Sequence, residues 1–254
     1  MILNQFKLEG RVALVTGSGR GLGQATAVAL AEAGADVALL DLSAPSETAA
    51  QIEALGRRCL TIACDLGQAS PADLSGVVDQ VVTGLGRIDI LINNAGIIRR
   101  QAAVEFSQAN WDDVLAINLD AVFWLSQAAG RIMLAQGSGK IVNICSMLSF
   151  QGGVIVPSYA ATKHAVAGVT KALANEWAGR GVNVNAIAPG YMATDNTAPL
   201  RADSGRSESI SERIPAGRWG TPADVAGPMV FLCSAAADYV HGAILTVDGG
   251  WLNR

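Results

Sequence analysis

The chain has few aromatic residues and few histidines. Aromatics make up 5% of its 254 residues and two residues are histidine, whereas half are hydrophobic and 28 are glycine. A chain of this length can bury a full core. A core of small aliphatic side chains joined by many tight turns favours alternating strands and helices over a β-sandwich.

The chain also lacks the cysteine and histidine spacing of metal sites. Its four cysteines show no C-x-x-C pattern and the two histidines add little to them, so we expect no metal site. We interpret the cysteines as small buried thiols in a reducing cytoplasm; they are Cys59, Cys64, Cys145 and Cys233.

Clustered positive charge and long apolar runs are absent too. The net charge is −4, and basic residues form no run beyond pairs such as Arg57–Arg58 and Arg99–Arg100. This argues against nucleic acid as the main partner. No stretch approaches the ~18 apolar residues of a membrane span, and the N-terminus has no cleavage-site pattern. We therefore expect a cytoplasmic protein without a membrane partner.

Apolar runs alternate with helical patterns along the chain. The spacing predicts strands over 11–16, 36–40, 59–63, 88–92, 140–144 and 182–187. It predicts helices over 21–33, 45–55, 71–85, 111–136 and 158–179, and one that begins near 222. Repeated strand–helix units predict an α/β fold over 1–254: a single-domain, Rossmann-type doubly wound parallel sheet in three α/β/α layers.

The segment 191–218 interrupts this rhythm because it is polar and rich in arginine and acidic residues. Long irregular insertions in compact domains are commonly lids or binding loops. We therefore predict a substrate lid at about 191–218.

A glycine-rich turn follows the first predicted strand. Backbone N–H groups of such a turn approach a pyrophosphate at the positive end of the next helix. The spacing is G-x-x-x-G-x-G, because Leu22 stands where the usual G-x-G-x-x-G fingerprint needs glycine. Many such turns merely cap a helix, but the position between a buried strand and a helix favours nucleotide binding. The turn consists of Gly17, Ser18, Gly19, Arg20, Gly21, Leu22 and Gly23.

An acidic residue ends the second predicted strand. A carboxylate at Asp41 can accept both hydroxyls of the adenosine ribose and would repel a 2′-phosphate, which favours NAD(H). The alternative is a helix cap, a role that Ser43 could also fill. Arg20 favours the opposite choice, since a cation in the glycine turn could bind a 2′-phosphate. We expect NAD, with NADP as a weaker second cofactor.

Tyr159 and Lys163 are four residues apart on a predicted helix, so they share one face. An ammonium beside a phenol stabilises tyrosinate, which would lower the pKa of Tyr159 and suit it to proton transfer at a carbonyl. Such a pair is also common on solvated helix faces. Ser146 changes the balance, because it ends a strand at the carboxyl edge of the sheet, where ligands bind in these folds. Asn118, a poor helix former inside the helix predicted over 111–136, suggests a local distortion that could hold water near Lys163.

These motifs together resemble the short-chain dehydrogenase/reductase family. The resemblance implies Tyr159 as general acid/base, Lys163 on the nicotinamide ribose, Ser146 orienting the substrate and Asn118 in a proton relay. It also implies a homotetramer joined through the helices 111–136 and 158–179. The further residues that it places at the cofactor are Asp65, Leu66, Asn93, Ala95, Gly96, Pro189, Gly190, Met192 and Thr194.

Four segments, 98–100, 146–153, 189–194 and 213–220, are similar to members of this family that act at C5 of a 3-deoxy keto sugar acid in bacterial uronate (pectin) catabolism. A guanidinium fork would suit the carboxylate of that substrate. The candidate substrate residues are Ser146, Ser149, Gln151, Tyr159, Arg99 and Arg201, with Arg100, Arg206, Arg213 and Asn196 as further possibilities. We interpret Trp219 and Trp251 as packing residues.

Three alternatives stay open at this point. The first is a reductase for another keto-uronate, such as the alginate-derived 4-deoxy-5-keto uronate, or an enzyme acting at C5 of gluconate. The second is a cofactor-binding sensor, which should have lost the tyrosine, lysine or serine. The third is an acyl-carrier-linked oxoacyl reductase, which Asp41 and the pI of about 5.2 oppose.

Overall fold

The computed structural model describes residues 1–254 apart from the side chain of Asn196, and in this part of the chain seven parallel strands form one sheet. The strand order is β3-β2-β1-β4-β5-β6-β7, which confirms the predicted doubly wound fold class. The strands are β1 Val12–Thr16, β2 Asp36–Asp41, β3 Cys59–Ala63, β4 Ile90–Asn93, β5 Gly139–Ile144, β6 Val182–Pro189 and β7 Ile244–Val247.

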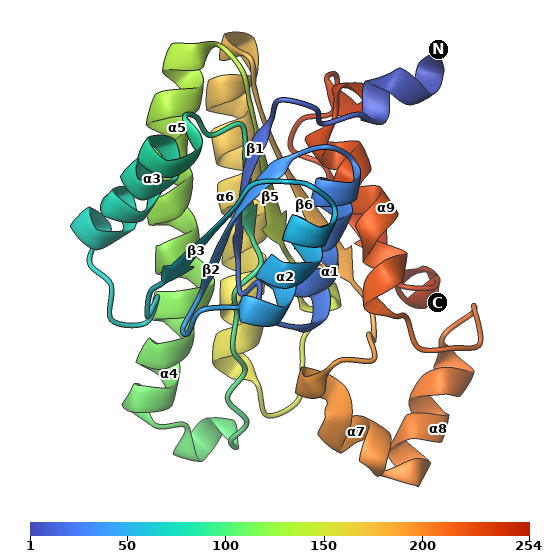
Figure 1. The fold of residues 1–254 in the computed structure, drawn as a ribbon. Coiled ribbons are helices and arrows are strands. Elements are labelled where there is room, and N and C mark those ends of the chain that lie inside the picture. Colours follow the sequence, from blue (N-terminus) through green and yellow to red (C-terminus); the bar gives the residue numbers. More distant parts are fainter.

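Helices cover both faces of the sheet, with α1, α2 and α9 on one face and α3, α5 and α6 on the other (Figure 1). Side chains of β1 alternate between the two layers: Leu14 packs beneath α3 and α5, whereas Ala13 and Val15 pack beneath α1 and α9. The helices are α1 Gly21–Glu32, α2 Ser46–Ala54, α3 Pro71–Leu85, α4 Gln108–Leu115, α5 Ala121–Gln136, α6 Pro157–Trp177, α7 Ala198–Ala202, α8 Ser204–Arg213 and α9 Pro222–Cys233.

The chain reverses its direction of winding between β1 and β4. β1 pairs with β2 on one side and with β4 on the other, so the connections after β1 and after β4 leave the sheet in opposite directions. In open parallel sheets, ligands bind at the carboxyl ends of the strands next to such a switch point. The fold therefore places the glycine turn, which follows β1, at this position.

The helix predicted over 111–136 is interrupted. The structure divides it into α4 and α5, joined by a π-helical turn over Ala116–Asp120. Asn118 lies in this turn, fully buried, and its amide pairs with the backbone of Ile97 in both directions: Oδ1 accepts from N–H and Nδ2 donates to the carbonyl, each at 2.9 Å. The distortion that Asn118 suggested is therefore present.

Two expectations about the C-terminal part were wrong. The segment 191–218 is largely helical rather than irregular, because Asp203 caps α8 by accepting the N–H of Arg206 at 3.0 Å and Ile210 packs into a buried cluster. The strands predicted from the sequence also end at 187, whereas a seventh strand, β7, follows at the edge of the sheet; its Ile-Leu-Thr-Val run is as apolar as that of β3 but was not assigned. Figure 1 shows α7 and α8 beyond the carboxyl edge of the sheet.

Candidate active site

A cavity of about 940 Å³ opens at the carboxyl ends of the strands. Its walls come from the glycine turn, the ends of β2 to β6, the start of α6 and the segment that contains α7 and α8. Most of the residues that the sequence assigned to a cofactor or substrate line it: Gly17, Arg20, Gly21, Leu22, Gly23, Asp41, Asp65, Leu66, Ala95, Gly96, Ser146, Gln151, Tyr159, Lys163, Pro189, Gly190, Met192 and Thr194.

The glycine turn presents bare backbone to the cavity, because its conformation excludes side chains at several positions. Gly17 and Gly21 have positive φ angles of 63° and 57°. A Cβ at Gly23 would collide with the carbonyl oxygen of Gly17. No side chain caps the N-terminus of α1, so its first N–H groups are open to an anion. This cradle fits a pyrophosphate.

Asp41 is held in a fixed orientation at the end of β2. Its Oδ2 accepts the N–H of Gly19 and its Oδ1 the N–H of Leu42, both at 2.8 Å. A carboxylate keeps further lone pairs after two such bonds, and Asp41 lines the cavity. The alternative that Asp41 caps the next helix is not seen, because the N-cap of α2 is Pro45.

Two residues of the glycine turn do not line the cavity. Ser18 is buried, and its hydroxyl donates to the carbonyl oxygen of Leu40 at 3.2 Å. Gly19 faces Asp41 through the bond described above. Both residues therefore fix the conformation of the turn by hydrogen bonds to the end of β2, on the side away from the cavity.

Asn94, rather than Asn93, faces the cavity. Its Nδ2 donates to the carbonyl oxygens of Thr16 and Gly17, at 2.9 and 3.0 Å, and so ties β4 to the glycine turn. Asn93 is buried and donates to Asn143 Oδ1 at 2.8 Å, away from the lining. The placement of Asn93 beside the cofactor therefore needs correction, since the strand directs its side chain inward.

Ser146, Tyr159 and Lys163 meet at one end of the cavity. Lys163 is 4% exposed, its Nζ donates to the carbonyl oxygen of Ile144 at 2.6 Å, and Nζ lies 5.6 Å from the centre of the Tyr159 ring. Ser146 lies at the end of β5, where its Oγ accepts the N–H of Leu148 at 3.1 Å. A proton donor and a second hydroxyl are thus presented to one site.

Ser149 links this group from behind. Its hydroxyl donates to the carbonyl oxygen of Lys163 at 2.7 Å and accepts the N–H of Ser146 at 3.2 Å. It is buried and does not line the cavity. The structure therefore places Ser149 behind Ser146 and Lys163, away from the cavity, whereas Gln151 lines the cavity as the sequence suggested.

The electrostatics of this end differ from the expectation. Burial lowers the pKa of Lys163 to about 8. Burial raises the pKa of Tyr159, and although a hydrogen bond from Ser146 and the charge of Arg100 act to lower it, the net direction is upward. The predicted lowering of the Tyr159 pKa by Lys163 is therefore not found in the free protein.

The comparisons with known proteins decide the family. A family model described as "Enoyl-(Acyl carrier protein) reductase" matches residues 17–252. A 2-dehydro-3-deoxy-D-gluconate 5-dehydrogenase from Dickeya dadantii is 56% identical over 258 residues, covering 100% of both chains. The chain belongs to the short-chain dehydrogenase/reductase family. It is an oxidoreductase that acts on CH–OH groups, and the cofactor of this family is NAD or NADP.

Solved structures of the family share this fold. A protein from Agrobacterium tumefaciens, crystallised with bound NADP, is 57% identical with a TM-score of 0.92 and covers 99% of this chain and 100% of its own. A gluconate 5-dehydrogenase from Burkholderia cenocepacia, in complex with NADP and tartrate, is 40% identical with a TM-score of 0.94 and full coverage of both chains.

Besides Arg20 of the glycine turn, three arginines of this dehydrogenase line the cavity: Arg100, Arg206 and Arg213. Two others assigned to the substrate do not. Arg99 forms an ion pair with Asp113 at 3.1 Å, and Arg201 donates to the carbonyl oxygen of Thr194 at 3.1 Å. Their assignment to the substrate therefore needs correction. The side chain of Asn196, a further candidate, lies outside the described residues.

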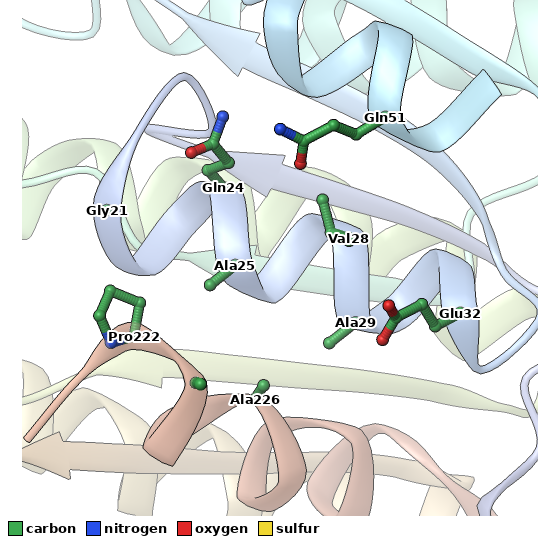
Figure 2. Close-up of a pocket in the computed structure, with 10 residues that line it drawn as sticks. Gly21, Gln24, Ala25, Val28, Ala29, Glu32, Gln51, Pro222 and Ala226 are labelled. Atoms are coloured by element: carbon green, nitrogen blue, oxygen red, sulfur yellow. The ribbon is translucent and has the colours of Figure 1, made fainter. Parts of the chain in front are cut away.

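Other features of the described chain add no second chemical centre. Within it, no group of three or more histidine, cysteine or acidic residues could hold a metal ion, and no helix is long and apolar enough to cross a membrane. A shallower groove of about 380 Å³ lies between α1 and α9, where Ala25 and Ala29 face Ala226 (Figure 2). Its walls are mostly small apolar side chains. The larger cavity is lined instead by hydroxyl, ammonium and guanidinium groups.

Proposed function

We propose that this dehydrogenase interconverts a ketone and a secondary alcohol at C5 of 2-dehydro-3-deoxy-D-gluconate, a step of uronate and pectin catabolism. The observation that carries the proposal is the 56% identity, over the full length of both chains, to the Dickeya enzyme of that name. The arginines that line the cavity support it, because the substrate is an anion.

The glycine cradle is proposed to hold the pyrophosphate of the cofactor at the N-terminus of α1. Asp41 would accept the ribose hydroxyls, Asp65 and Leu66 would border the adenine, and the segment 189–194 would border the nicotinamide. When bound, the nicotinamide supplies or accepts the hydride. Asp41 favours NAD(H), since a carboxylate held by two N–H groups cannot easily turn away from a 2′-phosphate.

Tyr159 is proposed as the proton donor in ketone reduction. Its hydroxyl proton would pass to the carbonyl oxygen, and the hydroxyl of Ser146 would donate a hydrogen bond to the same oxygen. In alcohol oxidation the proton returns to Tyr159. Lys163, fixed by the carbonyl of Ile144, would bind the nicotinamide ribose, and the π turn at Asn118 would carry the proton onward to solvent.

Two neighbouring activities are compared with this one. Gluconate oxidation at C5 involves the same chemistry, and the Burkholderia relative of that name holds NADP and tartrate, a hydroxy acid. Reduction of the alginate-derived 4-deoxy-5-keto uronate would also use an anionic ketone. Both substrates therefore belong in the test, with NADH and NADPH.

The test follows NAD(H) and NADP(H) absorbance with 2-dehydro-3-deoxy-D-gluconate, its 2,5-diketo form, gluconate, the alginate-derived 4-deoxy-5-keto uronate and an acyl thioester. We expect the highest kcat/KM for the 3-deoxy acids with NAD(H). Turnover of acyl thioesters alone would overturn the proposal. Tyr159→Phe should lower kcat by about a thousandfold or more while NADH binding is retained. Loss of both activity and NADH binding would indicate misfolding.

The assembly is proposed as a single-domain subunit, 1–254, with its lid at 191–218, in a cytoplasmic homotetramer joined through α4–α5 and α6. Family resemblance supports this proposal. Size-exclusion chromatography with light scattering tests it, with four subunits as the expected result.

A further inference from the structure

Helix α8 turns two arginines toward the cavity. Arg206, Ile210 and Arg213 are four and then three residues apart, so they lie on one face of the helix. Ile210 is buried in a cluster with Met147, Ile214 and Trp251, which anchors this face against the body of the protein. The flanking arginines both line the cavity as a consequence.

Arg213 lies on a fixed aromatic platform. The Cζ of its guanidinium is 3.9 Å from the centre of the Trp251 ring. Trp251 is 4% exposed and is packed edge-on against Tyr191, with 4.7 Å between ring centres. Stacking on an indole orients a guanidinium and leaves the N–H groups at its edge free to donate.

Arg213 also has no carboxylate partner among the described side chains, although other arginines near the cavity do. Arg20 is paired with Asp195 and Arg99 with Asp113. Among the described side chains, no carboxylate oxygen lies within 4.0 Å of a guanidinium nitrogen of Arg213, which is the limit for an ion pair. An oriented guanidinium without a protein partner, on the wall of a substrate cavity, is suited to a carboxylate ligand.

The position of Arg100 distinguishes it from Arg213. The charge of Arg100 is among the influences on the pKa of Tyr159 and opposes its net rise, whereas the charge of Arg213 is not among them. In a hexonate that reacts at C5, the carboxylate is separated from the reacting carbon by four carbon–carbon bonds. The carboxylate should therefore meet a cation on a more distant wall, and Arg213 on Trp251 fills that role.

We propose that Arg213, stacked on Trp251, binds the C1 carboxylate of the substrate through a two-pronged hydrogen bond and gives the enzyme its preference for sugar acids over neutral ketones. The inference rests on the proposed function and assigns the specificity of the same site. Because Arg213 belongs to α8, the lid would bring the recognition element to the substrate.

The experiment compares the 3-deoxy keto acid with its uncharged methyl ester in wild type and variants. Arg213→Gln should lower kcat/KM for the acid by about 10- to 100-fold and leave that for the ester within about twofold. Arg213→Lys should recover part of the loss, because a lysine retains the charge without the fork. Arg206→Gln should reduce kcat/KM for the acid less. Arg180→Gln, an exposed arginine at the opposite edge of the sheet, serves as the matched control.

The platform is tested with two substitutions of Trp251. Trp251→Leu removes the ring and should reproduce the selective loss with the acid, and Trp251→Phe should restore most of it, since the indole N–H has no acceptor among the described residues. Equal losses with acid and ester for Arg213→Gln would overturn the inference in favour of a structural role. An unchanged acid rate, or the larger loss in Arg206→Gln, would also overturn it. A wild-type enzyme that turns over no keto acid contradicts the proposed function instead.

Discussion

The guanidinium of Arg20 forms an ion pair with Asp195, with 3.2 Å between Nη1 and Oδ2. Arg20 lies in the glycine turn and Asp195 begins the short turn that precedes α7, so the pair connects the proposed cofactor cradle to the proposed lid. Both side chains are more than two-thirds exposed, which limits the pair to about 1 kcal/mol or less. A cofactor 2′-phosphate near Arg20 would have to compete with Asp195.

Asp195→Asn is therefore expected to favour NADPH. Without the carboxylate, Arg20 is free to bind a 2′-phosphate, and the ratio of kcat/KM for NADPH to that for NADH should rise up to about fivefold. Steady-state kinetics with both cofactors measure this ratio. Asp203→Asn is the matched control, because Asn retains the cap of α8 and the position lies in the same lid. An unchanged ratio in Asp195→Asn would remove Arg20 from the 2′-phosphate site.

Asp41→Ala should weaken the preference for NADH by about tenfold or more. The substitution removes the acceptor for the ribose hydroxyls and the charge that repels a 2′-phosphate. The two N–H groups of Gly19 and Leu42 are then free to meet the phosphate instead. The ratio of kcat/KM for the two cofactors again provides the measurement. If the ratio stays at the wild-type value, Asp41 does not contact the ribose.

Much of the site could be predicted because the sequence marks where buried strands end. Mainly apolar runs located β1, β2 and β5, and the rule that ligands bind at carboxyl edges then brought Ser146 and the glycine turn together. Tyr159 and Lys163 followed from helical spacing. These signals depend only on local periodicity and backbone conformation.

Two of the errors concern adjacent residues of which only one lines the cavity. Asn93 and Asn94 differ by one position, as do Arg99 and Arg100, and in each pair the second residue lines the cavity. In an extended chain, successive side chains point to opposite sides. When two neighbouring residues are identical, the sequence holds no pattern that shows which of them faces the cavity. Tertiary packing decides this choice.

Ser149→Ala tests the link behind the catalytic residues. The serine hydroxyl joins the backbone of Ser146 to that of Lys163, so its loss leaves the buried N–H of Ser146 without a partner and removes a second hydrogen bond from the carbonyl of Lys163, which lies inside α6. We expect the free energy of unfolding to fall by about 1–3 kcal/mol and kcat to fall about tenfold or more with little change in KM, because the residue positions Ser146 without touching substrate. A rise in KM alone would indicate direct contact with the substrate.

Lys163 gives the stability of the free enzyme a distinctive pH dependence. Burial lowers its pKa from 10.5 to about 8, although Cys145 opposes the shift. Between these values the unfolded chain holds a proton that the folded chain has released, so the contribution of Lys163 to the free energy of unfolding rises with pH. Below about pH 8 both states are protonated, and the full cost of the buried ammonium remains.

Lys163→Met removes that buried charge. The free energy of unfolding of the variant, relative to wild type, should be most favourable below about pH 8 and should decline by on the order of 3 kcal/mol as the pH rises to 10.5. Denaturant titrations at several pH values measure the difference. Lys171→Met, an exposed lysine on α6, provides the control and should show a constant difference. If the difference for Lys163→Met is constant as well, or grows with pH, the ammonium is not desolvated in the free enzyme.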